Sequence, residues 1–188
     1  LGLFPASSLC LGVNVTEFVF RQDGDFWYLT GFGEPDAWLL LSNHSRHQGR
    51  FTAMVVQDKD PTAEIWTGRR LGAQAAIGRF DLDEAYELAD IEMVLMEWLE
   101  GHDHVYFAQG HNDKADVKVL GALKHLRAQP KQFHTPTVMH DIRPLLHEMR
   151  LFKSTTEIAA MRAAAQIPSR AHCPVPYTHL TLPTSEPR

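Results

Sequence analysis

The sequence has very little cysteine. Only two of its 188 residues are cysteines, Cys10 and Cys173, and they lie near opposite ends of the chain. Two thiols cannot build a disulfide framework or a four-thiolate zinc site, and small secreted domains usually depend on the former. The sequence therefore favours a protein of the reducing cytoplasm.

Long apolar runs and an excess of positive charge are also absent. The longest apolar stretches are short pieces such as AWLLL at 37–41, far below the ~20 residues that a membrane-spanning helix needs. The chain has 18 Lys and Arg against 23 Asp and Glu, a net charge of −5 with neutral His. A basic surface that would attract a polyphosphate backbone is not indicated. We therefore expect neither a membrane nor a nucleic acid as a partner.

The two ends of the chain differ in composition from its body. The chain starts with Leu1, and the residues after it lack the positively charged start of a secretory signal, so we expect a truncated end. Five prolines occur within residues 168–188, and the stretch YTHLTLPT resembles the translation of a sequencing-library adapter. We expect residues 168–188 to be a non-native or disordered tail, with Pro168 ending the helical pattern before it.

Strand and helix patterns alternate through the body. The predicted strands are Glu17–Phe20, Ala37–Leu41, Phe51–Val56, Glu64–Trp66, His104–Ala108 and Thr137–Met139. The predicted helices are Glu84–Leu99, Asp113–Arg127 with Leu120, Leu123 and Leu126 buried, and a short one from Pro144 that buries Leu145, Leu146 and Met149. This alternation is typical of an α/β domain whose helices cover a largely buried sheet.

A further helix starts at a sharp boundary. Ser154 and Glu157 form the spacing of a capping box, in which each side chain hydrogen-bonds the other residue's backbone N–H. A well-capped helix after a complete α/β unit is what the start of a second domain would look like. We therefore predict a first domain at 1–150, a linking helix at 151–167 and the tail at 168–188.

The common catalytic motifs are missing. The segment from His147 begins like the zinc-binding H-E-x-x-H helix, but Leu151 stands at the second ligand position. No G-x-S-x-G elbow, phosphate-binding loop or G-x-G-x-x-G fingerprint occurs, and Cys10 has no identifiable base. Two histidine pairs in polar segments are predicted to lie on the surface: His44 with His47, and His102 with His104.

Two aromatic segments stand out instead. The segment FRQDGDFWYLTGFGEPDA at 20–37 is predicted to form an ordered corner of the core. In TAEIWTGRRLG, Trp66 falls at the end of a predicted strand, beside Arg69 and Arg70. A tryptophan there is either a core residue next to solvated arginines or an anchor for a partner.

Four blocks, in this order, resemble the N-terminal domain of bacterial Xaa-Pro aminopeptidases, also called aminopeptidase P. They are FRQDGDFWYLTGFGEPDA at 20–37, TAEIWTGRRLG at 62–72, VYFAQG at 105–110 and DIRPLLHEMRLFKSTTEIAAMRAAA at 141–165. The resemblance covers residues 10–167. It implies a mixed β-sheet with helices on both faces, of the creatinase/aminopeptidase P N-terminal, ribonuclease H-like type, followed by the first helix of a pita-bread catalytic domain.

The resemblance implies an enzyme that removes the first residue from peptides with proline in second position. In this family, two metal ions, usually manganese, are held by carboxylates and a histidine of the C-terminal domain, so no catalytic or metal-binding residue is carried over to this chain. We expect the chain alone to be inactive. Its implied role is assembly of a homo-oligomer, dimer or tetramer, and shaping of the site for proline-containing peptides, with Trp66 near a neighbouring subunit's active site and Arg69 and Arg70 as further candidates.

Two alternatives remain open. The chain could be a free-standing binding or scaffold module of the same fold, or part of a prolidase-like or creatinase-like hydrolase. The F-R-Q-D-x-D-F-W-Y-L-T-G-F and I-W-x-G-R-R blocks favour aminopeptidase P over the second alternative. The sequence does not choose between part of an enzyme and a scaffold.

Overall fold

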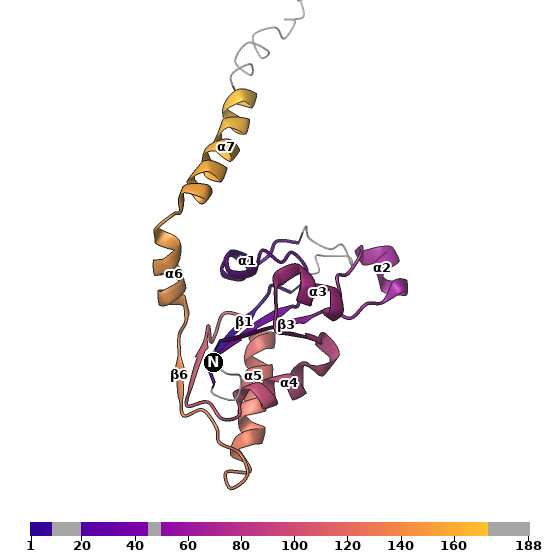
Figure 1. Cartoon of the computed structure of the whole chain (residues 1–188), viewed down its shortest axis with the longest axis vertical. Coiled ribbons are helices and arrows are strands. Elements are labelled where there is room, and N and C mark those ends of the chain that lie inside the picture. Colours follow the sequence, from indigo (N-terminus) through magenta and orange to yellow (C-terminus); the bar gives the residue numbers. More distant parts are fainter. Residues whose placement is uncertain (9–19, 45–49, 173–188) are drawn as a thin grey trace, which may run out of the picture. The chain divides into compact units, whose positions relative to one another are not determined.

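The computed structural model describes residues 1–8, 20–44 and 50–172 (Figure 1). The chain divides into two units, Leu1–Pro144 and Leu145–Arg188. None of the helices in the described ranges is long and apolar enough to span a membrane. Cys10, Cys173, His47 and all but one residue of the predicted strand at 17–20 lie outside the described residues.

The first unit is built on one six-stranded sheet with the strand order β4-β3-β2-β1-β5-β6. The strands are β1 Gly2–Pro5, β2 Trp38–Ser42, β3 Phe51–Val56, β4 Glu84–Glu87, β5 His104–Phe107 and β6 Val138–His140. β2 pairs antiparallel with β1 and with β3, whereas β3–β4, β1–β5 and β5–β6 are parallel pairs. The sheet is therefore mixed, as the resemblance implied.

Helices cover both faces of the sheet (Figure 1). In the first unit they are α1 Gly24–Thr30, α2 Pro61–Thr67, α3 Ala73–Phe80, the 3₁₀ turn η3 Leu88–Asp90, α4 Ile91–Leu99 and α5 Asp113–Arg127. Figure 1 shows α4 and α5 on one side of the sheet and α1 and α3 on the other. The helices α6 Arg143–Leu151, which begins at the border between the units, and α7 Thr155–His172 follow.

The core lies between the sheet and the α4–α5 layer. Leu40 and Val55 from the central strands and Trp98 from α4 are fully or almost fully buried in one apolar cluster, to which α5 adds Val119 and Leu123. Burial of each such side chain contributes about 1.5–3 kcal/mol relative to exposure. The other face is apolar too, with Phe26 of α1 buried and the rings of Phe32 and Phe80 packed edge to face.

Two predicted elements differ in type. The predicted strand at 64–66 is wrong, because these residues belong to helix α2. Asp60 caps that helix and Pro61 lies in its first turn, and this start signal outweighs the β-propensity of Ile65 and Trp66. The first part of the predicted helix at 84–99 is also wrong, since Glu84–Glu87 pairs with β3 as the edge strand β4.

Details of burial and helix ends differ as well. Leu120 faces solvent, with 43% of its surface exposed, while Leu123 and Leu126 are buried as predicted. In α6 only Leu146 is buried, whereas Leu145 and Met149 are exposed.

The capping box is confirmed. The Ser154 backbone N–H donates to Glu157 Oε2 at 2.7 Å, and the Glu157 N–H donates to Ser154 Oγ at 3.2 Å. The helix that follows, α7, continues beyond Pro168 to His172, so the predicted stop at Pro168 is wrong. A proline removes one backbone donor, and this helix continues without that hydrogen bond.

Candidate functional site

A short helical segment joins β3 to α3, and we call residues 57–72 the α2 arm. The helix starts where it does because Asp60 Oδ1 accepts hydrogen bonds from the Thr62 N–H at 2.9 Å and the Ala63 N–H at 3.1 Å. It ends at Gly68, whose φ of +85° is open to glycine and strained for other residues. The capping chemistry thus fixes about two turns of helix between two loops.

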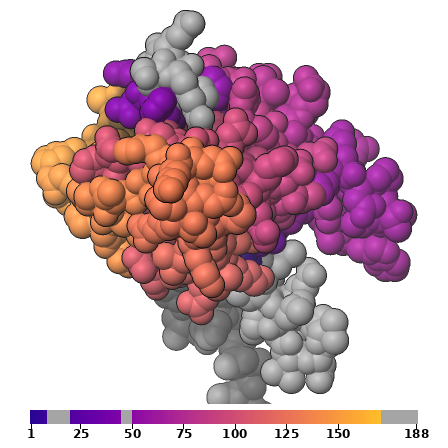
Figure 2. Space-filling view, turned by 90° about the horizontal axis from the view of Figure 1, so that it is seen from below, coloured from indigo at the N-terminus to yellow at the C-terminus, as the bar shows by residue number. Residues whose placement is uncertain are grey.

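The α2 arm exposes its apolar side chains. No residue of α2 is buried, and 75% of Ile65 and 86% of Trp66 are exposed. Figure 2 shows the arm as a purple lobe that projects at the right from the rest of the first unit. A large aromatic side chain that is mostly exposed on a projecting helix has the character of a binding anchor.

The two arginines after Trp66 occupy different environments. Arg69 is exposed, whereas Arg70 is partly buried and its Nη1 donates to the backbone carbonyl of Asp58 at 3.1 Å. The next residue, Leu71, donates its N–H to Glu34 Oε1 at 2.8 Å. The structure therefore places Trp66 and Arg69 on the exposed part of the arm and Arg70 at its base.

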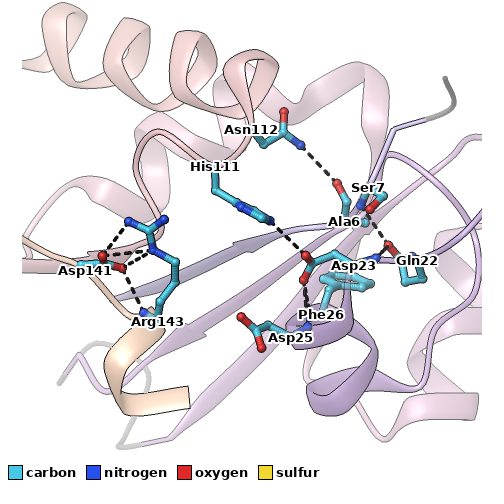
Figure 3. A network of polar contacts seen from close by, with 10 residues as sticks. All are labelled: Ala6, Ser7, Gln22, Asp23, Asp25, Phe26, His111, Asn112, Asp141 and Arg143. Carbon is cyan, nitrogen blue, oxygen red and sulfur yellow. Dashed lines mark hydrogen bonds and ion pairs between the residues drawn. The ribbon is translucent and has the colours of Figure 1, made fainter. Parts of the chain in front are cut away.

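A second polar cluster lies where the strands β1 and β5 end (Figure 3). The His111 ring points toward Asp23, with 3.0 Å between Nε2 and Oδ2. Asp23 Oδ1 also accepts from the N–H groups of Asp25 and Phe26, both at 2.9 Å, and so caps α1. Partial burial opposes ionisation of Asp23, but the hydrogen bonds from Phe26, His111 and Asp25 outweigh it and leave its pKa below the usual value.

This cluster links segments that are distant in the sequence. Gln22 Oε1 accepts from the Ser7 N–H at 2.9 Å, and Gln22 Nε2 donates to the carbonyls of Phe32 at 3.1 Å and Glu34 at 2.8 Å. The cluster has one carboxylate–imidazole pair, and that carboxylate is occupied by the helix cap. We therefore assign it a structural role. Sequence reasoning missed the Asp23–His111 contact, although the Asp-Gly-Asp pattern before an aromatic run signals a helix start.

Several histidines contact another polar side chain. His104 Nδ1 lies 2.9 Å from His140 Nε2, and His134 Nε2 lies 2.8 Å from Asp103 Oδ1. His102 is buried, with its Nε2 2.9 Å from Ser42 Oγ, so the predicted surface position is wrong for this residue. Across residues 1–8, 20–44 and 50–172, no three His, Cys, Asp or Glu side chains are placed to hold a metal ion.

Comparison with known proteins shows the family. A family model described as "Aminopeptidase P, N-terminal domain" matches residues 2–106, more than half of the chain and all of the α2 arm. The chain therefore belongs to this family. The resemblance carried by the four sequence blocks and the mixed α/β fold that it implied are confirmed.

Individual relatives agree with this assignment. The chain is 46% identical to Xaa-Pro aminopeptidase of Escherichia coli (strain K12) over 158 residues, which are 84% of this chain and 36% of that protein. It is 35% identical to the Haemophilus influenzae Xaa-Pro aminopeptidase over 159 residues, 85% of this chain and 34% of that protein.

Solved structures give the same result. The low-pH form of E. coli aminopeptidase P matches with a TM-score of 0.87 and 42% identity, over 91% of this chain and 39% of that one. A zinc-substituted form of the same relative in complex with product matches equally well. The chain thus spans little more than a third of the length of these relatives.

Proposed function

We propose that this chain acts as the non-catalytic N-terminal region of an Xaa-Pro aminopeptidase, which releases the first residue from peptides with proline second. Family membership and the 36% share of the E. coli enzyme that the chain matches support this proposal. The two metal ions, proposed to be manganese, would be held by residues of another part of the enzyme. The described residues of this chain, which lack a group of three suitable ligands, do not fit them.

The proposed contribution of this chain is to assemble a homo-oligomer and to shape a peptide site. In this proposal the α2 arm reaches a neighbouring subunit, where Trp66 packs against the proline-containing peptide, with Arg69 beside it. The main support for this role is that Trp66 is 86% exposed on a helix that buries none of its own residues. The flat apolar face of an indole suits the rigid ring of proline.

We also propose a cytoplasmic location. The support is compositional, because 188 residues contain only two cysteines and cannot form a disulfide framework.

The test is a full-length enzyme made by joining residues 1–167 of this chain to the catalytic region of the E. coli relative. Trp66→Ala is expected to raise KM for a short Xaa-Pro peptide by about tenfold, the loss of an anchor contact worth about 1.4 kcal/mol. Bound metal should not change, because no ligand is altered. Trp66→Phe keeps an aromatic face and should recover most of the loss. Unchanged kinetics for Trp66→Ala would contradict the proposal.

A further inference from the structure

We infer that Arg70 and Glu34 are positioning residues: they fix the base of the α2 arm, and thereby the direction of Trp66, and Arg70 is not itself a ligand for peptide. The structural part of this inference stands on the contacts at the base of the arm. Its consequence for catalysis rests on the proposed function.

The helix of the arm cannot orient itself by packing. It has seven residues and buries none of them, whereas helices of this length are marginal in water unless tertiary contacts stabilise them. A projecting helix without a buried face keeps a fixed direction only if its two ends are held. The contacts that decide where Trp66 points must therefore lie at the base.

Contacts at the base join the two ends of the arm. The Arg70 Nη1 to Asp58 carbonyl hydrogen bond, 3.1 Å long, connects positions 12 residues apart that flank the helix on either side. The Lys59 side chain also covers Gly72, since a Cβ on that glycine would lie 2.9 Å from Lys59 Cγ. The arm is thus closed into a loop at its attachment point.

A further contact fastens this loop to the body of the domain. Glu34, in the loop before β2, accepts the Leu71 N–H at 2.8 Å across 37 positions of sequence. β2 is a central strand whose Leu40 is fully buried. Glu34 therefore holds the base of the arm against the loop that leads into this central strand.

The environment of Arg70 argues against a direct peptide contact. Its Nε is shielded from solvent, as are Glu34 Oε2 and Asp58 Oδ1. Groups enclosed in this way cannot meet a peptide that approaches from solvent unless the base opens. Arg69, by contrast, is exposed and free of this constraint.

The first experiment measures the order of the arm in the full 188-residue chain. We would record {¹H}–¹⁵N heteronuclear NOEs for the arm amides and for the Trp66 indole, assigned through Trp66→Phe. Arg70→Ala and Glu34→Ala should each lower these NOEs in the arm and leave those of α5 unchanged. Arg69→Ala removes the neighbouring charge, and it should change neither the NOEs of the arm nor those of α5. Unchanged arm NOEs in both Arg70→Ala and Glu34→Ala would overturn the inference. If Arg70→Ala does not fold, Arg70→Met takes its place, because methionine keeps an apolar stem but cannot donate to the Asp58 carbonyl.

The second experiment measures kinetics in the full-length enzyme described above. If the loosened arm holds its productive direction a third of the time, Arg70→Ala raises KM about threefold. Arg70→Lys can still donate to a carbonyl and should return KM most of the way to its unchanged value. Arg79→Ala on α3 is the control and should leave KM unchanged. In the Trp66→Ala background, Arg70→Ala should cause no further loss, because both changes act through one side chain.

The outcomes separate the two proposals. A raised KM in Arg70→Ala with an ordered arm would mean that Arg70 contacts peptide directly, and would overturn the inference. A disordered arm together with normal kinetics in both Trp66→Ala and Arg70→Ala would support the positioning role of Arg70 and Glu34 and reject the proposed function.

Discussion

Asp23 shows how one side chain can serve two purposes at the residue scale. One oxygen caps α1 and the other meets His111 from the segment after β5. Asp23→Ala removes both contacts, and we expect it to lower the free energy of unfolding by about 1–2 kcal/mol, the usual cost of a lost cap with a little more for the pair. Urea denaturation at neutral pH measures this, with Asp25→Ala as the control on the same turn. A loss of unfolding free energy in Asp23→Ala no larger than that in Asp25→Ala would contradict this prediction.

The pH dependence of this contribution follows from the lowered pKa of Asp23. The ordinary value of the carboxyl is 3.8 and the folded protein lowers it. The unfolded state therefore binds the proton more readily, so the stabilisation is complete above the ordinary value and is lost as the pH falls through the lowered one. The difference in unfolding free energy between the chain and Asp23→Asn should shrink over that acid range.

The residue scale also shows what sequence can and cannot reveal about a site. Trp66 was singled out because a large aromatic beside Gly-Arg-Arg is chemically distinctive. The role of Arg70 could not be predicted in the same way, because its partner is the backbone carbonyl of Asp58, which has no residue-type signature. Asp23 and His111 are 88 positions apart in the sequence, and only the folding of the sheet brings their side chains together.

At the scale of elements, helix α2 should unfold locally while the base of the α2 arm and the rest of the domain stay folded. Asp60→Ala removes the cap of α2 and should destabilise that helix locally by about 1 kcal/mol. Since α2 buries no residue, the global unfolding midpoint should remain within experimental error of the unchanged chain. Hydrogen exchange of the 62–67 amides, compared with those of α5, tests this prediction. A matching fall in global stability would show that the arm is coupled to the core.

The success of element prediction followed the strength of local signals. Phe51–Val56 and Asp113–Arg127 were predicted with the observed bounds, because one is a continuous apolar run and the other has an Asn112 cap and a regular apolar stripe. The strand at Glu84–Glu87 was missed because its edge position lets polar residues occupy a strand. β1 was missed because four residues give too short a pattern to separate from a loop.

At the scale of the whole molecule, we expect the 188-residue chain to have no Xaa-Pro aminopeptidase activity on its own. Its described residues provide no set of three ligands for a metal ion, and the metal is what would activate water in the proposed enzyme. An assay with added manganese and a proline-second tripeptide measures this, with the E. coli relative as the positive control. Turnover by the pure chain that chelation abolishes would contradict the assignment of this region as non-catalytic.

The position of β1 sets the order in which the domain can be completed. β1 is the first element in the described part of the chain, yet it lies inside the sheet between β2 and β5, with Gly2 opposite Leu41 on one side and Tyr106 on the other. During synthesis its antiparallel partner becomes available early, whereas its parallel partner emerges only about a hundred residues later, a late and slow pairing. Until then the nascent chain carries an open, apolar strand edge, and a ribosome-bound intermediate ending before β5 should depend on chaperones.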